Sequence, residues 1–378
     1  MAVLSIPILV LGAMEENIDP KEYGVTQQLF KEWRSPRFGN SNPQKIESPV
    51  WEWLVRSKLC GYLSTQKMDG PSPFDEGPTW SFDRFGQTKT QLPDGRTVYI
   101  GGEHEDHYDP DFYIYNDVIV EHPNGEFDFY CYPKTDFPPS DFHTATLIGS
   151  KIVLIGSLGY PQERVEASTQ LYLLDLNDFK ISPINSSGKS PGWIHRHEAI
   201  LDTSQTSITV TKGFIEIGLD SPLRENIDDW KLDIENWTWQ RLTERKWPRW
   251  ELTRKDKARN HIYDIRQALW SNEVNWEEHH QQDMARLEES MGFSVDFNLV
   301  KALYDFDFTH ESLVEDEEEH NVYWIYVDGV RVRFVEERYC LNVTVEGSLG
   351  NQTLTSMREQ LISSLNELEI SEWTINEY

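Results

Sequence analysis

A run of acidic residues and histidines between two aromatic-rich segments is the first feature with potential chemistry. The segment 101–117 reads GGEHEDHYDPDFYIYND. Carboxylate oxygens on a loop suit hard divalent cations, and an imidazole extends the choice to zinc or manganese. The candidate residues of this segment are Glu103, His104, Glu105, Asp106, His107, Tyr108, Asp109 and Asp111, of which His104, Asp106 and His107 are the candidate metal ligands.

Two interpretations of this segment stay open. Its spacing matches neither the D-x-[DN]-x-[DN]-G calcium loop nor the HExxH zinc helix. A solvated acidic loop, or an acidic surface that binds a partner, has the same composition. The acidic loop or partner-binding surface is favoured over a metal site. No cofactor is required by the sequence, although a divalent cation would fit.

Other catalytic signals are weak. The chain has no GxSxG, no GxGxxG and no GxxxxGK[ST], and none of its cysteines lies beside a histidine. His279 and Asp283 lie four residues apart on one face of a predicted helix, but no further ligand follows at metal spacing, so a solvated helix face is favoured.

Charge and cysteine usage limit the partners. The 378 residues include 64 Asp and Glu against 35 Lys and Arg, for a net charge of -29. Such a surface repels phosphate backbones and anionic lipid, so we expect neither nucleic acid nor membrane, and a basic protein is the favoured partner. Three widely separated cysteines suit the cytoplasm. The apolar opening 2–13 is predicted to be a buried first strand rather than an export signal.

An internal repeat organises the region 80–247. The segments RFGQTKTQLPDGRTVYIGG, DFHTATLIGSKIVLIGS and HRHEAILDTSQTSITVTKG align, and each is followed by a variable loop and a second strand pair. Glu121, Asp175 and Asp233 are equivalent, which gives repeats of about 50 residues. Each repeat is predicted to run strand, tight turn, strand, long loop, strand, tight turn, strand.

This pattern resembles the kelch-repeat family. The resemblance rests on the doublet Gly101-Gly102 after a hydrophobic strand and on the aromatic residues Phe179 and Trp237 four positions after an acid. It implies a mainly β fold with four-stranded propeller blades, in which the loop 101–117 projects to one face and binds. The second and third repeats do not retain both glycines of this doublet.

Three evident blades are too few for a closed propeller. The resemblance therefore implies that the terminal segments or a second subunit, as in a homodimer, complete it. It also places His143, His197 and Glu198 near a central channel. There they would bind a ligand or, in the favoured interpretation, hold neighbouring blades together.

The remaining segments have different patterns. The chain is predicted to comprise an irregular and helical N-terminal extension (1–79), the repeat region (80–247), a helical segment (248–310) and a small α+β module (320–378). Helices are expected over 48–63 behind Ser48-Pro49, over about 260–291 as a pair, and over 297–303. The module is predicted as βββαβ with a hairpin turn at Asp328-Gly329, after an acidic linker at 314–320.

These observations favour a kelch-like interaction scaffold that binds a protein, with a basic target that it inhibits or neutralises as one version. The alternative is a metal-dependent enzyme or small-ligand binder that uses the 101–117 segment and the channel histidines.

Overall fold

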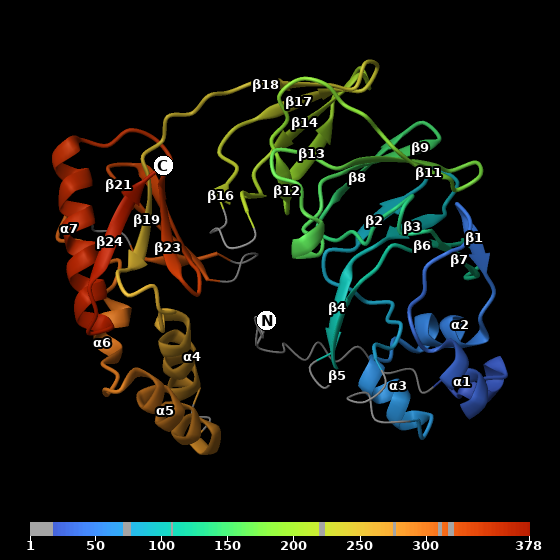
Figure 1. Ribbon diagram of the computed structural model, residues 1–378, viewed down its shortest axis with the longest axis horizontal. Helices are drawn as coiled ribbons and strands as arrows, with labels where there is room; N and C mark the ends of the chain where they lie inside the picture. Colours follow the sequence, from blue (N-terminus) through green and yellow to red (C-terminus); the bar gives the residue numbers. More distant parts are fainter. Residues whose placement is uncertain are drawn as a thin grey trace. The chain divides into compact units, whose positions relative to one another are not determined.

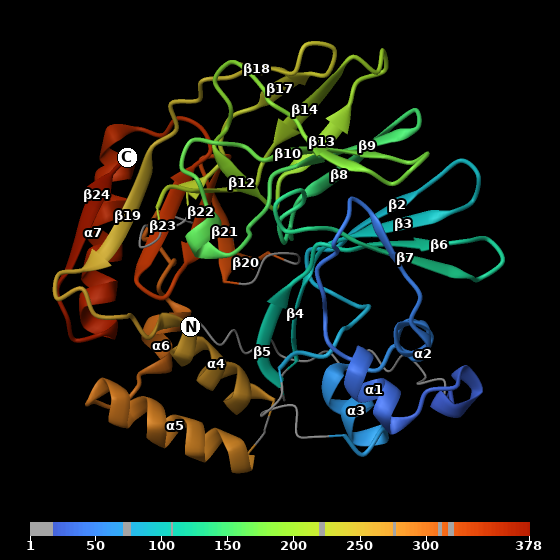
Figure 2. The same cartoon turned by 45° about the vertical axis from the view of Figure 1, so that its right-hand side comes forward.

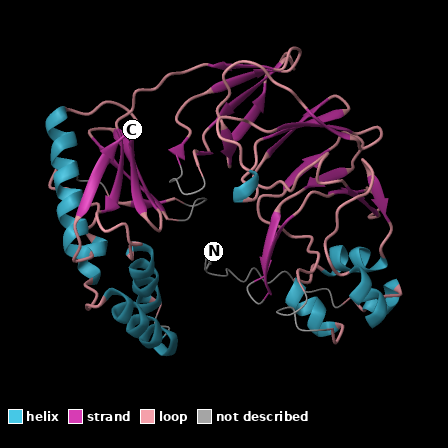
Figure 3. Ribbon diagram, viewed as in Figure 1, coloured by secondary structure: helices cyan, strands magenta, loops and turns pink. Residues whose placement is uncertain are grey.

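The computed structural model describes residues 18–70, 77–106, 109–218, 224–274, 277–308, 312–316 and 321–378. The chain forms two compact units, Met1–Glu244 and Arg245–Tyr378. Strands dominate the first, and the second combines one sheet with four α-helices (Figure 1, Figure 3). The predicted mainly β fold with helical additions is confirmed at this level. Among the described residues, no helix is long and apolar enough to cross a membrane.

Each of the three sequence repeats folds into one antiparallel sheet in meander order, as predicted. The first repeat contributes β2 (Thr88–Gln91), β3 (Thr97–Ile100), β6 (Val118–Glu121) and β7 (Phe127–Cys131). The second contributes β8 (Thr144–Ile148), β9 (Lys151–Ile155), β10 (Leu171–Asp175) and β11 (Ile181–Pro183). The third contributes β13 (Glu198–Leu201), β14 (Ser207–Thr211), β17 (Trp230–Asp233) and β18 (Thr238–Arg241).

The three sheets pack face to face in a row, and the first strand of the second sheet, β8, lies next to both β2 and β13 (Figure 2). Both faces of the second sheet are buried. Ile152 and Leu154 join the core shared with the first sheet, and the alternating residues Val153 and Ile155 join the core shared with the third. This explains why β9 is a continuous apolar run rather than an alternating one.

The outer edges of the three sheets are covered, which blocks pairing with other chains. β1 (Gln44–Ile46) extends the first sheet beyond β7. The side chain of Asn42 donates to the carbonyl of Ile181 and accepts from its N–H, at 2.7 and 3.0 Å, along β11. Ser187 pairs with the β18 edge, because its N–H donates to Trp237 O and its carbonyl accepts from Trp239 N.

The N-terminal extension covers the outer face of the first sheet. Its elements are η1 (Pro20–Tyr23), α1 (Gln27–Trp33), α2 (Pro49–Ser57) and α3 (Gly61–Lys67). Trp51 of α2 stacks on Trp80 at 4.8 Å between ring centroids, and both rings contact Phe129 of β7 edge to face. Ser48 caps α2 as predicted, since its Oγ accepts from the N–H of Trp51.

The single helix predicted over 48–63 is wrong. The chain forms α2 and α3 instead, and the break falls at Lys58, whose φ of 52° ends α2 in the left-handed conformation. The predicted first strand at 2–13 lies outside the described residues.

Short strands lie where the connections between second and third strands were predicted as loops. In the first repeat, β4 (Glu103–Asp106) and β5 (Asp109–Ile114) form an antiparallel ribbon. In the third, β12 (Trp193–His195), β15 (Phe214–Glu216) and β16 (Arg224–Glu225) form a small sheet. The second repeat has only η2 (Pro161–Glu163) at this place. The expectation of a long irregular loop at 101–117 is therefore corrected: its described part is largely strand.

The second unit is built on one antiparallel sheet in the order β20-β21-β22-β23-β19-β24. Its strands are β19 (Arg249–Arg254), β20 (Val314–Glu315), β21 (Val322–Val327), β22 (Val330–Glu336), β23 (Cys340–Val345) and β24 (Trp373–Glu377), and its helices are α4 (Ile262–Glu273), α5 (Glu277–Met291), α6 (Phe297–Lys301) and α7 (Asn351–Leu368). Leu361 and Leu365 of α7 and Ile262 and Ile265 of α4 are buried in the core that the helices share with one face of the sheet.

The predicted βββαβ order is present as β21, β22, β23, α7 and β24, and Asp328 and Gly329 turn the first hairpin with positive φ values of 50° and 75°. Two expectations are wrong. β19 lies inside the segment predicted as helical and pairs between β23 and β24, so this strand belongs to the module's sheet. Val314 and Glu315, expected in a solvated linker, pair with β21.

Candidate functional site

One end of the three-sheet row collects the connections of all three repeats. In each repeat, the segment before the first strand and the connection after the second strand lie at the same end, because the two strands are antiparallel. We call this the loop end and define it as the described residues of 84–86, 101–117, 141–142, 156–170, 193–197 and 212–229. The connections also contact one another, since the Tyr160 hydroxyl accepts from the N–H of Ile114 at 2.9 Å.

The β4–β5 ribbon rises from the first sheet at this end. Phe85 and Glu103 exchange two backbone hydrogen bonds of 2.8 and 2.9 Å, which makes the residue before β2 a third partner of the ribbon. His104 pairs with Tyr113 across the ribbon, and the register shifts between His104 and Asp106. Glu103 and His104 are both half-buried.

Other predicted residues of this segment are only partly placed. The backbones of Glu105, Asp106, Asp109 and Asp111 belong to β4 or β5, but their side chains lie outside the description. His107 and Tyr108 lie outside the described residues altogether. Among the side chains that are described, no group of three or more His, Cys, Asp or Glu is placed to hold a metal ion.

The channel candidates His143 and His197 form the same contact in successive repeats. His143 Nε2 lies 3.0 Å from Thr88 Oγ1, and His197 Nε2 lies 2.9 Å from Thr144 Oγ1. In each pair the histidine directly precedes the first strand of one sheet and the threonine begins the first strand of the sheet before it. This is the geometry of the structural interpretation, in which the histidines join neighbouring sheets.

Burial sets the protonation state of these rings. Desolvation lowers the pKa of His143 to about 4, and desolvation together with the nearby His195 and His143 lowers the pKa of His197 to about 3. Both imidazoles are therefore neutral at pH 7. Glu198 is not with them: it is exposed and pairs with Lys212 at 2.6 Å.

Buried ion pairs lie among the segments of the loop end. Arg84 binds Asp117 through both guanidinium nitrogens, with Nη2 to Oδ2 at 3.0 Å, and its guanidinium lies 3.4 Å from the Tyr115 ring centroid. In the next repeats, Arg164 pairs with Glu216 at 2.9 Å. These ion pairs join segments of the loop end to one another, within the first repeat and between the second and the third, and this preorganises the loop end.

Several exposed apolar side chains belong to the loop end. Phe85 is 52% exposed and Val165 is 60% exposed. Phe112 and Ile217 are also exposed, and the Phe112 ring meets Tyr160 edge to face at 6.1 Å. No sequence pattern indicates these residues, because they come from three repeats and a strand-rich chain contains many isolated apolar residues.

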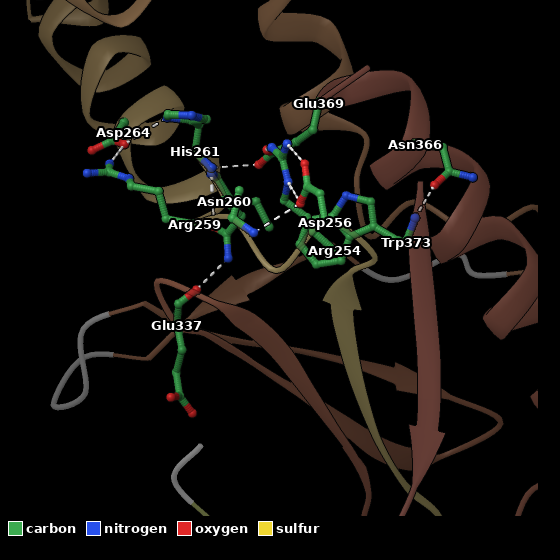
Figure 4. A network of polar contacts seen from close by, with 12 residues as sticks. Arg254, Asp256, Arg259, Asn260, His261, Asp264, Glu337, Asn366, Glu369 and Trp373 are labelled. Carbon is green, nitrogen blue, oxygen red and sulfur yellow. Dashed lines mark hydrogen bonds and ion pairs between the residues drawn. The ribbon is translucent and has the colours of Figure 1, made fainter. Parts of the chain in front are cut away.

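A second polar cluster lies in the other unit, where β19, α4 and α7 meet (Figure 4). Glu369 is buried and accepts from Arg254 Nη1 at 2.7 Å and from the His261 N–H at 2.6 Å. Burial raises the pKa of Glu369 despite these donors. Because these groups bind one another, and Arg254 also binds Asp256, the cluster has the character of a structural joint between elements.

In comparisons with known proteins, no family model matches the chain, and no curated protein matches it. A solved structure described as "Structure of YjhT" aligns with 44% of this chain and 74% of its own at 11% identity, with a TM-score of 0.28. A similarity of this size carries no argument about fold or function.

Proposed function

We propose that this chain is a kelch-like protein-interaction scaffold. Its three sheets act as the blades of an open β-propeller arc, and the loop end binds a protein partner. The observation that carries the proposal is that Phe85, Phe112, Val165 and Ile217, exposed apolar side chains from all three repeats, all belong to the loop end. Apolar and aromatic residues held by a rigid support are what protein interfaces use as anchors.

Charge points to the kind of partner. The chain carries a net charge of -29, and the ribbon sequence 103–111 contributes five carboxylates among nine residues. This negative charge favours a basic protein, accelerates its association and makes the association sensitive to salt. Inhibition or neutralisation of that basic protein is the proposed outcome. The small number of cysteines, three in 378 residues, supports a cytoplasmic location.

The test compares three versions of the full chain, each tagged and recovered from its own host. Phe85→Ser with Phe112→Ser removes two anchors, and Ile200→Ser is the matched control, because Ile200 is 61% exposed on the outer face of the third sheet, away from the loop end. We expect the wild-type chain and the control to retain the same stoichiometric basic protein, and the double variant to lose it. Retention by all three versions would contradict the assignment of the loop end.

The salt dependence is measured on the same complexes. We expect retention to fall steeply between about 50 and 300 mM salt, since exposed charges are screened over this range. Unchanged retention would contradict the basic character of the partner, while the anchor variants would still test the surface.

A further inference from the structure

Every joint between neighbouring sheets in the first unit repeats the same backbone contact. The N–H of Phe142 donates to the carbonyl of Gly86 at 2.9 Å, and the N–H of Arg196 donates to the carbonyl of Phe142 at 2.9 Å. These three residues are equivalent in the repeat, and all have positive φ values, of 62°, 48° and 53° along the chain. Together with the His143 and His197 contacts, they define how one sheet docks on the next.

A glycine after the second strand makes room for this docking. Gly101 and Gly156 have left-handed φ values of 59° and 72°. A Cβ on Gly101 would lie 2.1 Å from the carbonyl oxygen of Ser140, and a Cβ on Gly156 would lie 2.2 Å from that of Ile194. The backbone of the following repeat therefore occupies the space that a side chain at this position would need.

The third repeat replaces this glycine with a lysine. The strand register aligns Lys212 with Gly101 and Gly156, and it aligns Glu198 with Thr144. Lys212 has the same left-handed backbone, with φ of 57°, so its Cβ lies where the carbonyl of a further repeat would have to come. Its Nζ pairs with Glu198 at 2.6 Å, and the two side chains are 70% and 51% exposed.

The outer face of the third sheet also differs in composition from the sheet faces that pack against a neighbouring sheet. Ile200, Thr209, Lys231 and Gln240 lie side by side across its four strands. Three of the four are polar, and none of them is buried. The second sheet has apolar, buried residues on both faces, so the third sheet has the composition of a terminal repeat.

We propose that the third repeat is a capping repeat, in which Lys212 and Glu198 close the row of sheets. The pair excludes a further sheet from the docking geometry that the first three share, whether that sheet comes from this chain or from a second copy. At the opposite end of the row, the N-terminal helices cover the first sheet. The arc is therefore complete at three sheets, and a six-bladed ring of two chains is excluded at this face.

The first test is the mass of the full chain by sedimentation velocity, for the wild-type protein, Lys212→Trp and the control Lys151→Trp, an exposed position in the turn of the second sheet. We expect the three proteins to have the same mass, because a larger side chain at 212 extends into solvent. A wild-type oligomer that Lys212→Trp alone dissociates would overturn the proposal, since it would place a second copy on the capped face.

The second test adds a repeat. A copy of residues 191–243 is inserted after Thr243 of the wild-type chain. In a second version, the third repeat that precedes the insertion carries E198T and K212G, which are the residue types of the second repeat at these positions. We expect the strand amides of the inserted repeat to exchange hydrogen at least tenfold more slowly in the E198T/K212G background. Equal exchange in the two backgrounds would overturn the capping role of the pair.

Discussion

His197 Nε2 and Thr144 Oγ1 lie 2.9 Å apart and connect the third sheet to the second, one repeat after His143 and Thr88 connect the second sheet to the first. Both histidines are buried at the joints between sheets that also share apolar cores. The two contacts therefore add a repeated polar link to the apolar packing of neighbouring repeats.

Removal of the His197 side chain should destabilise the first unit. His197→Ala deletes a buried ring and leaves the Thr144 hydroxyl without this partner, so we expect a loss of about 2–4 kcal/mol in the free energy of unfolding. His122→Ala is the control, because His122 is partly exposed and pairs with Asp128 on the first sheet, and we expect a loss below about 1 kcal/mol. Equal losses in urea unfolding would contradict the role of the joint.

The buried histidines should also make stability depend on pH. The pKa of His143 is about 4 and that of His197 about 3 in the folded chain, against 6.5 for a free imidazole. The unfolded chain therefore binds more protons below pH 6.5, and the free energy of unfolding falls as the pH drops from about 6.5 toward 4. Above pH 6.5 this contribution is fully present, and each ring accounts for about 3–5 kcal/mol of the loss at most.

Urea unfolding at pH 7.5, 6.5, 5.5 and 4.5 checks this prediction. Carboxylates also titrate in the lower part of this range, so His197→Gln, which cannot titrate, isolates the histidine contribution. We expect the variant to have a shallower decline between pH 6.5 and 4.5. A decline as steep as that of the wild-type chain would show that the imidazole of His197 does not carry the effect.

The glycine at the docking position should tolerate no side chain. Gly156→Ala places a Cβ 2.2 Å from Ile194 O and 2.8 Å from the His197 ring, and we expect a loss of about 3 kcal/mol or more. Gly149→Ala is the control: Gly149 also has a positive φ, of 57°, but nothing lies within 4 Å of its Cβ position. There we expect only the backbone penalty of about 1–2 kcal/mol. Similar losses by thermal and chemical unfolding would argue against close docking of the sheets.

The buried ion pair of the second unit should be sensitive to the loss of one partner. Arg254→Met leaves the carboxylate of Glu369 buried without its cation, so we expect a loss of about 3–5 kcal/mol. The adjacent Lys255 pairs with Glu372 on the surface, and Lys255→Met should lose less than about 1 kcal/mol. Chemical unfolding monitored by tryptophan fluorescence compares the two. If the two variants are equally stable, the buried carboxylate of Glu369 does not need Arg254 as its cation.

Ile370 marks a position where the backbone is strained. It follows α7 with a φ of 45° and is 70% exposed, so a β-branched residue occupies a left-handed helix end that favours glycine. Ile370→Gly should raise the free energy of unfolding by about 1 kcal/mol, because little apolar burial is lost. A decrease in stability would show that the side chain makes contacts that its exposure does not suggest.

Much of the strand content could be predicted because alternation and turn residues are local signals. All twelve strands of the three repeats lie where alternating or continuous apolar runs between turn residues predict them, α4 to α7 lie where apolar residues recur at helical spacing, and the Asp328-Gly329 turn is present. The ribbon β4–β5 could not be predicted in this way, since its charged residues have low strand propensity and its contacts with Phe85 and Tyr160 come from outside the ribbon. β19 was assigned to the wrong segment because its partners lie about 90 and 120 residues later in the chain.

Part of the candidate site could also be predicted from the sequence, and part could not. The acidic segment and the two repeated histidines are visible in the sequence. The set of exposed apolar residues that includes Phe85 and Val165 depends on which connections of different repeats share one end, and exposure is a property of the folded chain. The difference between Lys212 and the glycines is present in the alignment of repeats, but its consequence follows only from the 2.1 and 2.2 Å distances that a Cβ would meet.

Native mass spectrometry of the wild-type chain recovered from its own host tests the central claim most directly, because it reports protein partners, metals and small ligands in one spectrum. We predict the 44.3 kDa chain together with one stoichiometric basic protein, and a loss of that complex when recovery is repeated at high salt. A chain that carries a metal ion or a small molecule and no protein partner would contradict the scaffold function.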